Sequence, residues 1–254
     1  MVGFIIFILG LSIGSFLNVV IYRLPGAKSL WSPGSTCTSC GKPIAFYDNI
    51  PVLSYLILRG KCRHCRAPIS PRYPLVELVT ALLFLIVYKH TGLSLYLLLY
   101  LTFLCFMISI ALIDLETGLI LDKQLLLLLL TGVVLNLYLS FIPWRAALIG
   151  MATGAGVMFF IALLGKVMLK KESLGLGDVK FAGVAGFFLG ALPTLAASYI
   201  GFLLAFIIIL AAKALHKTVP RHIPLGPFLA GGFFLFLLWG NEIGALYISL
   251  LQPR

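Results

Sequence analysis

Charged residues are scarce in this 254-residue chain, where Asp, Glu, Lys and Arg make up 11% of the sequence and only eight residues are acidic. Soluble domains carry roughly 25% charged residues. Apolar residues account for 61% of the chain, which is more than a water-soluble fold can bury and far too much for a disordered chain. Short strands of alternating polarity are also lacking, which excludes an outer-membrane barrel. The chain is therefore an integral membrane protein.

Long apolar runs are what the sequence has instead. Several approach the ~20 residues that a helix needs to cross the hydrocarbon core of a bilayer. The run at 181–212 is too long for one crossing, and Pro193 is expected to break it into two helices. No internal repeat stands out. The sequence predicts an all-α polytopic membrane protein with about eight transmembrane helices, drawn from the runs at 2–22, 75–88, 93–113, 124–144, 146–165, 181–212 and 223–241.

The net charge of +11 is distributed as a topology signal. With the N-terminus outside, almost every Lys and Arg falls in a segment on the inner side, and only Lys89, Arg145 and Arg254 remain outside. This split follows the positive-inside rule, so no nucleic-acid partner is expected. The first span has no basic residue before it and Arg23 after it, which favours a retained anchor over a cleavable signal peptide.

One polar segment lies between Arg23 and Pro74, where seven prolines and much of the charge gather. At about 50 residues, it is near the size at which a hydrophobic core alone is insufficient to stabilise a fold. The expected organisation is a first transmembrane helix at 1–22, a small cytoplasmic domain at 23–74 and a membrane domain at 75–254.

Four of the five cysteines lie in this polar segment, as the pairs Cys37/Cys40 and Cys62/Cys65, with 21 residues between the pairs. Each Cys-x-x-Cys pair can supply two thiolates from one tight turn, so the two pairs together predict a tetrahedral structural zinc site. Two disulfides or four free thiols are the alternatives, and a reducing cytoplasm disfavours the disulfides. Four sulfur ligands leave no open position for a catalytic metal. Cys105 lies in an apolar run and is expected to be a packing residue.

Two acidic residues stand where an apolar run meets the expected inner face of the membrane. Asp114 ends the run at 93–113, and Asp178 follows two glycines in Gly175-Leu-Gly-Asp. Ionisable groups at membrane depth are costly, which makes them functional candidates. Two carboxyl groups brought together share a proton, so one can act as a base on water while the other polarises a peptide carbonyl. This is the chemistry of an aspartic protease.

Other readings of these carboxylates stay open from the local sequence. Asp178 can cap its helix, and Asp114 can pair with a lysine such as Lys180. Asp122 competes for the first catalytic role, although Gly118 is expected to interrupt the helix between it and Asp114. A proton-coupled transporter is a second class of protein, but its carboxylates are expected near the bilayer midplane. A non-enzymatic assembly subunit that docks partners through the zinc segment is a third.

Several motifs follow one another in a distinctive order: 14–25 (GSFLNVVIYRLP), 47–55 (YDNIPVLSY), 58–63 (LRGKCR), 69–77 (ISPRYPLVE), the Asp114 segment, 175–178 (GLGD) and 223–228 (IPLGPF). In this combination the chain resembles the bifunctional type IV prepilin peptidases (prepilin leader peptidase and N-methyltransferase), which are Gly-x-Gly-Asp membrane aspartic proteases. The likeness covers nearly the whole chain, including the zinc-type segment with its two cysteine pairs.

The resemblance implies that Asp114 and Asp178, 64 positions apart, are the catalytic pair of a peptidase domain at 75–254. It implies that the enzyme cuts the basic leader from prepilins and pseudopilins on the cytoplasmic side, after a glycine. It also implies that the new N-terminal residue, usually phenylalanine, is then methylated with S-adenosylmethionine. The implied location is the bacterial inner membrane, and the implied partners are prepilins and lipid, with a homo-oligomer left open.

Three residues depart from the family pattern. They are Thr38 after the first cysteine, Arg66 after the last cysteine, and Leu121, which precedes Asp122 at a position where proline is usual. None of these departures removes a metal ligand or a catalytic carboxylate.

Methyl transfer has weaker support in the sequence, because no Gly-x-Gly loop after a strand indicates a Rossmann-type cofactor site. Asp48, Asn49 and Glu77 could contact the methyl donor or the amine. The first two could equally be turn formers and the third an interfacial charge.

The substrate helix is expected to pack laterally between spans, at small residues that permit a close approach. Packing within the protein explains the same residues as well. The candidates are Gly150, Gly154, Gly156, Gly183, Gly186 and Gly190.

Overall fold

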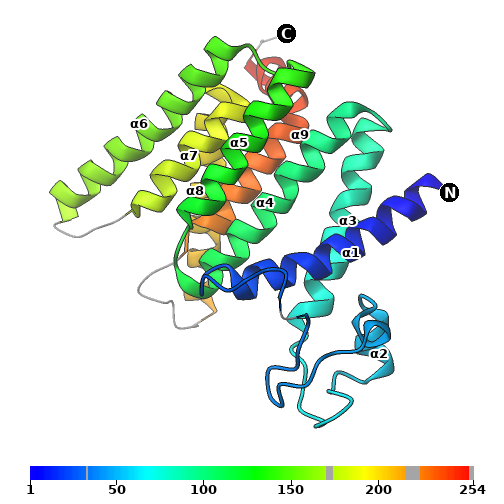
Figure 1. Cartoon of the computed structure of the whole chain (residues 1–254). Helices are drawn as coiled ribbons and strands as arrows, with labels where there is room; N and C mark the ends of the chain where they lie inside the picture. The colour runs from blue at the N-terminus through cyan, green and yellow to red at the C-terminus, as the bar shows by residue number, and fades with distance from the viewer. Residues whose placement is uncertain (33, 170–173, 216–223, 252–254) are drawn as a thin grey trace. The chain divides into compact units, whose positions relative to one another are not determined.

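The computed structural model describes residues 1–32, 34–169, 174–215 and 224–251, and every secondary-structure element of three or more residues in these ranges is a helix (Figure 1). This confirms the predicted all-α class. A few residues used in the sequence arguments lie outside the described ranges: Lys170, Lys171, Glu172, Lys217, Arg221, Ile223 and Arg254.

Seven helices of the described residues are long and apolar enough to cross a membrane. They are α1 (Val2–Arg23), α3 (Arg72–Thr91), α4 (Leu95–Thr117), α5 (Asp122–Leu139), α6 (Trp144–Leu169), α8 (Ala191–Ala214) and α9 (Gly226–Leu251). The remaining predicted span is α7 (Leu176–Leu189), whose 14 residues extend about 21 Å, less than the ~30 Å of a hydrocarbon core.

The predicted break between α7 and α8 falls at Gly190 rather than at Pro193. Gly190 has a φ of 81°, which glycine adopts without strain and which ends α7. Pro193 lies in the first turn of α8, where a missing N–H costs nothing because no acceptor precedes it in the helix.

Contacts divide the chain into two compact units, Met1–Leu97 and Leu98–Arg254. In the first unit α1 packs along α3 at two glycines. A Cβ atom on Gly10 would lie 2.5 Å from Ala81 Cα, and one on Gly14 would lie 2.7 Å from Glu77 Cα. Small residues thus set a close crossing of the two helices. The polar segment between them contains the 3-10 helix η1 (Phe46–Asn49) and the short helix α2 (Leu53–Ile57).

In the second unit α7 is the central helix. It packs against α5, α6, α8 and α9, and nine of its 14 residues are buried. From Phe181 to Leu189 the helix is apolar around its whole circumference, which requires such an interior position. The Phe181 ring meets the Phe233 ring of α9 edge-on, with 5.1 Å between the ring centroids. The centroids of the Phe188 ring and the Phe103 ring of α4 are 4.9 Å apart.

Glycines join α6 to α7 so closely that a side chain at Gly150 or Gly186 would collide with the carbonyl oxygen of the other. Gly154 and Gly183 make similar contacts across the same pair of helices. Four of the six glycines considered for a substrate helix are therefore occupied by packing within the chain. Gly156 faces open space, and Gly190 ends α7.

Candidate functional site

The four cysteines of the two pairs meet in one cluster in the first unit. All four Sγ atoms lie within 4.8 Å of one another, and Cys37 Sγ and Cys65 Sγ are 3.8 Å apart. Tetrahedral zinc with bonds of about 2.3 Å to sulfur requires sulfur–sulfur distances of about 3.8 Å. Hydrogen bonds from the backbone N–H groups of Cys40 and Ser39 lower the pKa of Cys37 to about 6, which favours the thiolate form that binds metals. The donor set fits a closed four-sulfur centre.

Each cysteine pair is held by the same backbone turn, in copies at residues 35–44 and 60–69, which we call the cysteine turns. In both, the N–H of the first cysteine donates to the carbonyl five residues later at 2.9 Å. An isolated bridge closes each turn, joining residues 36 and 43 in one and 61 and 68 in the other. The expectation that the chain holds no internal repeat is therefore wrong. The signal in the sequence is Cys-x-x-Cys-x-x-Pro-Ile, which occurs twice with an offset of 25 residues.

The residue after each second cysteine is left-handed, with a φ of 71° at Gly41 and 61° at Arg66. Glycine adopts this conformation freely, whereas another residue pays roughly 1–2 kcal/mol. We expect Arg66→Gly to raise the free energy of unfolding by about 0.5–1 kcal/mol, since the added chain entropy of glycine offsets part of the relieved strain. Gly41→Ala is the matched control and is expected to destabilise. Thiol accessibility during thermal unfolding of the full chain measures both, and an unchanged midpoint for Arg66→Gly contradicts the argument.

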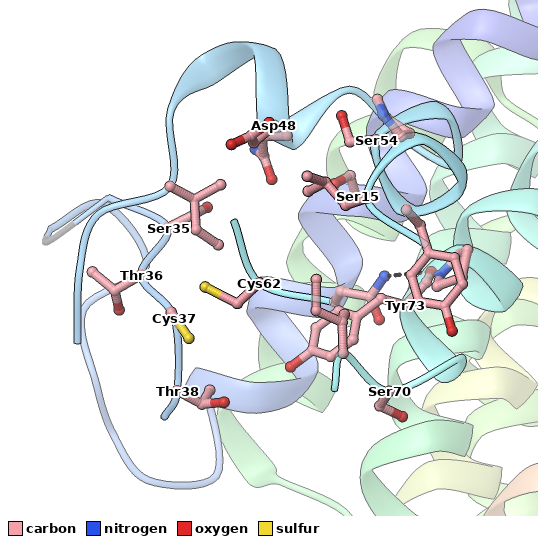
Figure 2. Close-up of a pocket in the computed structure, with 18 of the residues that line it drawn as sticks. Ser15, Ser35, Thr36, Cys37, Thr38, Asp48, Ser54, Cys62, Ser70 and Tyr73 are labelled. Atoms are coloured by element: carbon pink, nitrogen blue, oxygen red, sulfur yellow. Dashed lines mark hydrogen bonds between the residues drawn. The ribbon is translucent and has the colours of Figure 1, made fainter. Parts of the chain in front are cut away.

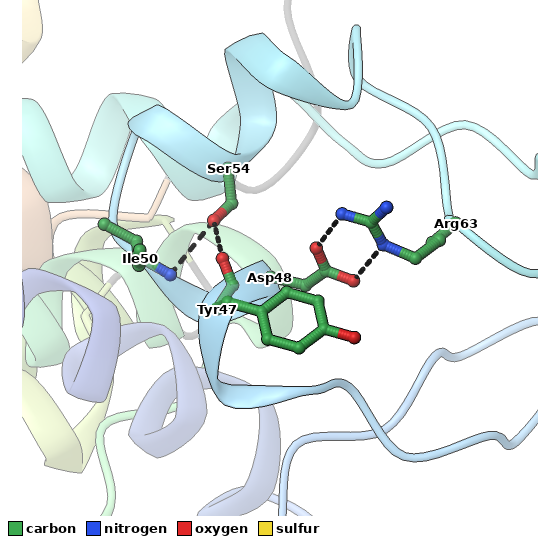
Figure 3. Close-up of polar contacts among 5 residues, drawn as sticks. All are labelled: Tyr47, Asp48, Ile50, Ser54 and Arg63. Atoms are coloured by element: carbon green, nitrogen blue, oxygen red, sulfur yellow. Dashed lines mark hydrogen bonds and ion pairs between the residues drawn. The ribbon is translucent and has the colours of Figure 1, made fainter.

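Asp48 ties η1 to the second cysteine turn (Figure 3). Its carboxylate accepts two hydrogen bonds from Arg63, of 2.7 Å from Nε and 2.5 Å from Nη2, and its side chain is only 8% exposed. The Ser54 hydroxyl of α2 donates to the Tyr47 carbonyl at 2.9 Å and accepts from the Ile50 N–H at 3.1 Å. These contacts give Asp48 a structural role in this segment.

The Arg63 guanidinium holds the pKa of Asp48 below its ordinary value. A carboxyl group with a depressed pKa in the folded state contributes stability above the ordinary Asp pKa of about 3.9, and that contribution is lost as the pH falls through the lower, folded value. We therefore expect acid to destabilise the first unit less steeply in Asp48→Asn than in the unchanged chain. Thermal midpoints between about pH 6 and 3 test this, and parallel curves for the two proteins contradict it.

A cavity of about 1120 Å³ lies beside the cysteine turns, within the first unit (Figure 2). It is lined by α1, the segment from η1 to α2, the cysteine turns and the start of α3. Glu77 of α3 lies in this lining, 7% exposed, and accepts a 2.7 Å hydrogen bond from the Val52 N–H. Asn18 of α1 is 3% exposed and donates to the Tyr73 carbonyl at 3.1 Å. Polar residues of the motif at 14–25 line this cavity, which accounts for their presence in an otherwise apolar helix.

Asp114 and Asp178 lie in the second unit, close enough for their charges to interact. Asp114 stands near the end of α4 and is 5% exposed, and its Oδ2 accepts a 2.8 Å hydrogen bond from the Gly226 N–H. Asp178 stands in the first turn of α7, and its Oδ2 accepts a 3.2 Å hydrogen bond from the Gly175 N–H. Each carboxylate thus accepts one glycine N–H. The donor to Asp114 belongs to the motif at 223–228, and the donor to Asp178 belongs to the motif at 175–178.

The structure gives Asp122 surroundings that differ from those of Asp114. Asp122 begins α5, and the Lys180 ammonium contacts both of its carboxylate oxygens, at 2.8 and 2.9 Å. Gly118, with a φ of 67°, follows the end of α4 and separates Asp122 from Asp114, as expected. Lys180 therefore pairs with Asp122 rather than Asp114. Asp178 caps α7, as one of the interpretations of the sequence expected, and the hydrogen bond from the Gly175 N–H orients its carboxylate.

Together these features define a class of protein, a polytopic helical membrane protein with a four-cysteine centre and two interacting carboxylates at helix ends. Residues 8–91 match the model of the Bacterial Peptidase A24 N-terminal domain, and residues 101–215 match the Type IV leader peptidase family. The chain belongs to the type IV leader peptidase family, which confirms the resemblance noted from its motifs.

Curated relatives agree over nearly the full length. The chain is 37% identical to the prepilin leader peptidase/N-methyltransferase of Aeromonas hydrophila over 273 residues, covering 96% of this chain and 93% of the relative. It is 37% identical to the protein of the same name from Neisseria gonorrhoeae, covering 90% and 88%. For the Stutzerimonas stutzeri protein the identity is 35%, covering 96% and 93%. No solved structure matches the chain.

Proposed function

We propose that the chain is a bifunctional membrane enzyme, which cleaves the basic leader from prepilins and pseudopilins and then methylates the new N-terminal residue. The observation that carries the peptidase function is that Asp114 and Asp178, on separate helices of one unit, interact electrostatically and each accept a glycine N–H. The family and the names of the relatives support the substrate class.

In the proposed cleavage the two carboxyl groups share one proton, because like charges a few ångströms apart do not both ionise easily. The ionised group takes a proton from water, which attacks the carbonyl carbon of the residue before the cut. The protonated group donates to the carbonyl oxygen. The carbon–nitrogen bond of the resulting tetrahedral species then breaks, and its nitrogen takes up a proton to leave as the new N-terminus. This route requires no covalent enzyme intermediate.

The distribution of basic residues supports placement in the bacterial inner membrane with the N-terminus outside. In this orientation the cysteine turns and both aspartates lie on the cytoplasmic side, where the leader of a prepilin precedes its apolar helix. The cut therefore falls at the inner face of the membrane.

We assign zinc to the four-cysteine cluster, with a structural role. Purified protein is expected to contain about one zinc ion per chain, and Cys37→Ser to lose it, because three sulfurs hold zinc less tightly than four. Cys105→Ser removes a cysteine outside the cluster and is expected to retain the metal. Metal analysis by mass spectrometry gives the answer, and zinc retained in full by Cys37→Ser overturns the assignment.

We place methyl transfer in the cavity of the first unit. S-adenosylmethionine supplies an electrophilic methyl group when it is bound. At about 1120 Å³, the cavity exceeds the ~300–1,000 Å³ typical of ligand sites and has room for a methyl donor and the end of a peptide. An acceptor oxygen of the buried Asn18 that has no protein partner among the described residues supports a polar ligand there.

The test of both activities uses the full chain in liposomes with a purified prepilin, followed by mass spectrometry of the products. The leader is expected to be removed with or without S-adenosylmethionine. The mature product is expected to gain one methyl group only when this donor is added. An intact precursor after prolonged incubation contradicts the peptidase function, and an unmethylated product in the presence of the donor contradicts the methyl-transfer function.

A further inference from the structure

A buried carboxylate in the cavity wall has no role in the peptidase chemistry. Glu77 lies in the second turn of α3 and is 7% exposed. Its Oε2 accepts the Val52 N–H at 2.7 Å, and Ser15 of α1 lines the same cavity. The Val52 N–H is a neutral donor, so this hydrogen bond does not compensate the negative charge of Glu77. A buried carboxylate held in this way provides a binding site for a cation.

Asn18, which lines the same cavity, carries a second acceptor. Its amide nitrogen donates to the Tyr73 carbonyl at 3.1 Å, while its Oδ1 has no hydrogen-bond partner among the described residues. The side chain is 3% exposed and lines the cavity. Buried polar atoms are almost always paired, so an unpaired oxygen on a cavity-lining residue points to a partner outside the described residues.

Helix geometry places the two acceptors on the facing sides of α1 and α3. Tyr73, which Asn18 contacts, precedes Glu77 by four residues and therefore lies on the same face of α3. On α1, Gly14 precedes Asn18 by four residues and packs directly on the Glu77 backbone. The motif at 14–18 thus supplies a glycine for close approach, together with a hydroxyl and an amide that line the same cavity as Glu77.

The chemistry of these groups selects the ligand. A carboxylate and an amide oxygen are both acceptors, and a primary ammonium group offers three N–H donors and a positive charge. In the proposed reaction such a group could come from the N-terminus of the cleaved pilin or from the amino-acid end of the methyl donor. Only the N-terminus must lie beside a group that can take up its proton.

We propose that Ser15, Asn18 and Glu77 form an acceptor subsite that binds the N-terminal ammonium group of the cleaved pilin. The inference rests on the proposed methyl-transfer function and adds to it the residues that hold the amine. The Glu77 carboxylate takes one proton from the ammonium group. The amine nitrogen then attacks the methyl carbon of the sulfonium donor, and the carbon–sulfur bond breaks with its electron pair remaining on sulfur.

The first test measures binding to the full chain in detergent without a methyl donor. The probe is a short peptide with a free N-terminal phenylalanine, compared with the same peptide acetylated at its N-terminus. The unchanged chain is expected to bind the free peptide about tenfold more tightly, because acetylation removes the charge. Glu77→Gln is expected to abolish this preference, whereas Glu77→Asp retains part of it. Glu242→Gln removes an exposed carboxylate of α9 and is expected to leave the preference intact.

A second test separates this proposal from the proposed function. Glu77→Gln is expected to retain zinc and to remove leaders, since Asp114 and Asp178 lie in the other unit, but to lose most methylation. If the unchanged chain methylates and Glu77→Gln methylates equally well, the subsite is wrong and the function stands. If the unchanged chain fails to methylate, the proposed methyl-transfer function fails. Weaker binding of S-adenosylmethionine to Glu77→Gln, with the peptide preference intact, also overturns the subsite.

Discussion

Asp178→Asn is expected to reduce the rate of leader cleavage by about 10³-fold or more, since asparagine can neither accept nor donate the shared proton. The change preserves the fold, because the amide oxygen of asparagine can still accept the Gly175 N–H that caps α7. Asp114→Asn is expected to cause a loss of the same order, and its amide oxygen can still accept the Gly226 N–H. Gel shift and mass spectrometry of a prepilin incubated with each variant measure the rates.

Asp122→Asn is the matched control for these two changes. Asp122 also lies at a helix end in the second unit, but its side chain is 69% exposed and is paired with Lys180. Exposed ion pairs contribute about 1 kcal/mol or less, so cleavage by this variant is expected within about fivefold of the unchanged rate. A large loss in Asp122→Asn with normal cleavage by Asp114→Asn would reassign the catalytic role.

Gly226→Ala is expected to reduce cleavage by about 10²-fold, because a displacement of about 1 Å in a catalytic group has an effect of that size. A Cβ atom at position 226 would lie 2.6 Å from Asp114 Oδ2 and 3.0 Å from its Cγ. The Asp114 side chain or the start of α9 must therefore shift, and the 2.8 Å hydrogen bond from the Gly226 N–H is distorted. The same cleavage assay measures the effect.

Gly231→Ala controls for the loss of a glycine in the same helix. A Cβ atom there would meet nothing within 4 Å, so this variant is expected to cleave at the unchanged rate. Normal cleavage by Gly226→Ala would show that the contact between α9 and Asp114 has no part in catalysis.

Composition was sufficient to predict the helical architecture, because seven apolar runs have the length that a bilayer requires. The position of the break before α8 could not be predicted from the sequence, since Gly190 and Pro193 are both compatible with a helix boundary. Only the observed backbone distinguishes a positive φ at Gly190 from a proline inside a first turn. The short length of α7 was missed for the same reason.

The residues of the candidate site were predicted more completely than the contacts that hold them. Asp114 and Asp178 stood out because carboxylates are rare at membrane depth. That Gly226 donates to Asp114 depends on a contact 112 positions apart, which no local pattern reveals. Of the proposed acceptor subsite, the sequence offered Glu77 as a contact for the amine but not Asn18, because the subsite depends on the packing of α1 on α3.

The most direct test of the catalytic pair compares Asp114→Asn, Asp178→Asn and the double variant in one cleavage assay. Residues that act as a unit lose their function when either is removed, so the losses do not multiply. We expect all three variants to share the same residual rate, at about 10³-fold or more below the unchanged chain. A double variant that is slower than either single variant by the product of their separate effects, or a single variant that cleaves normally, would contradict the account.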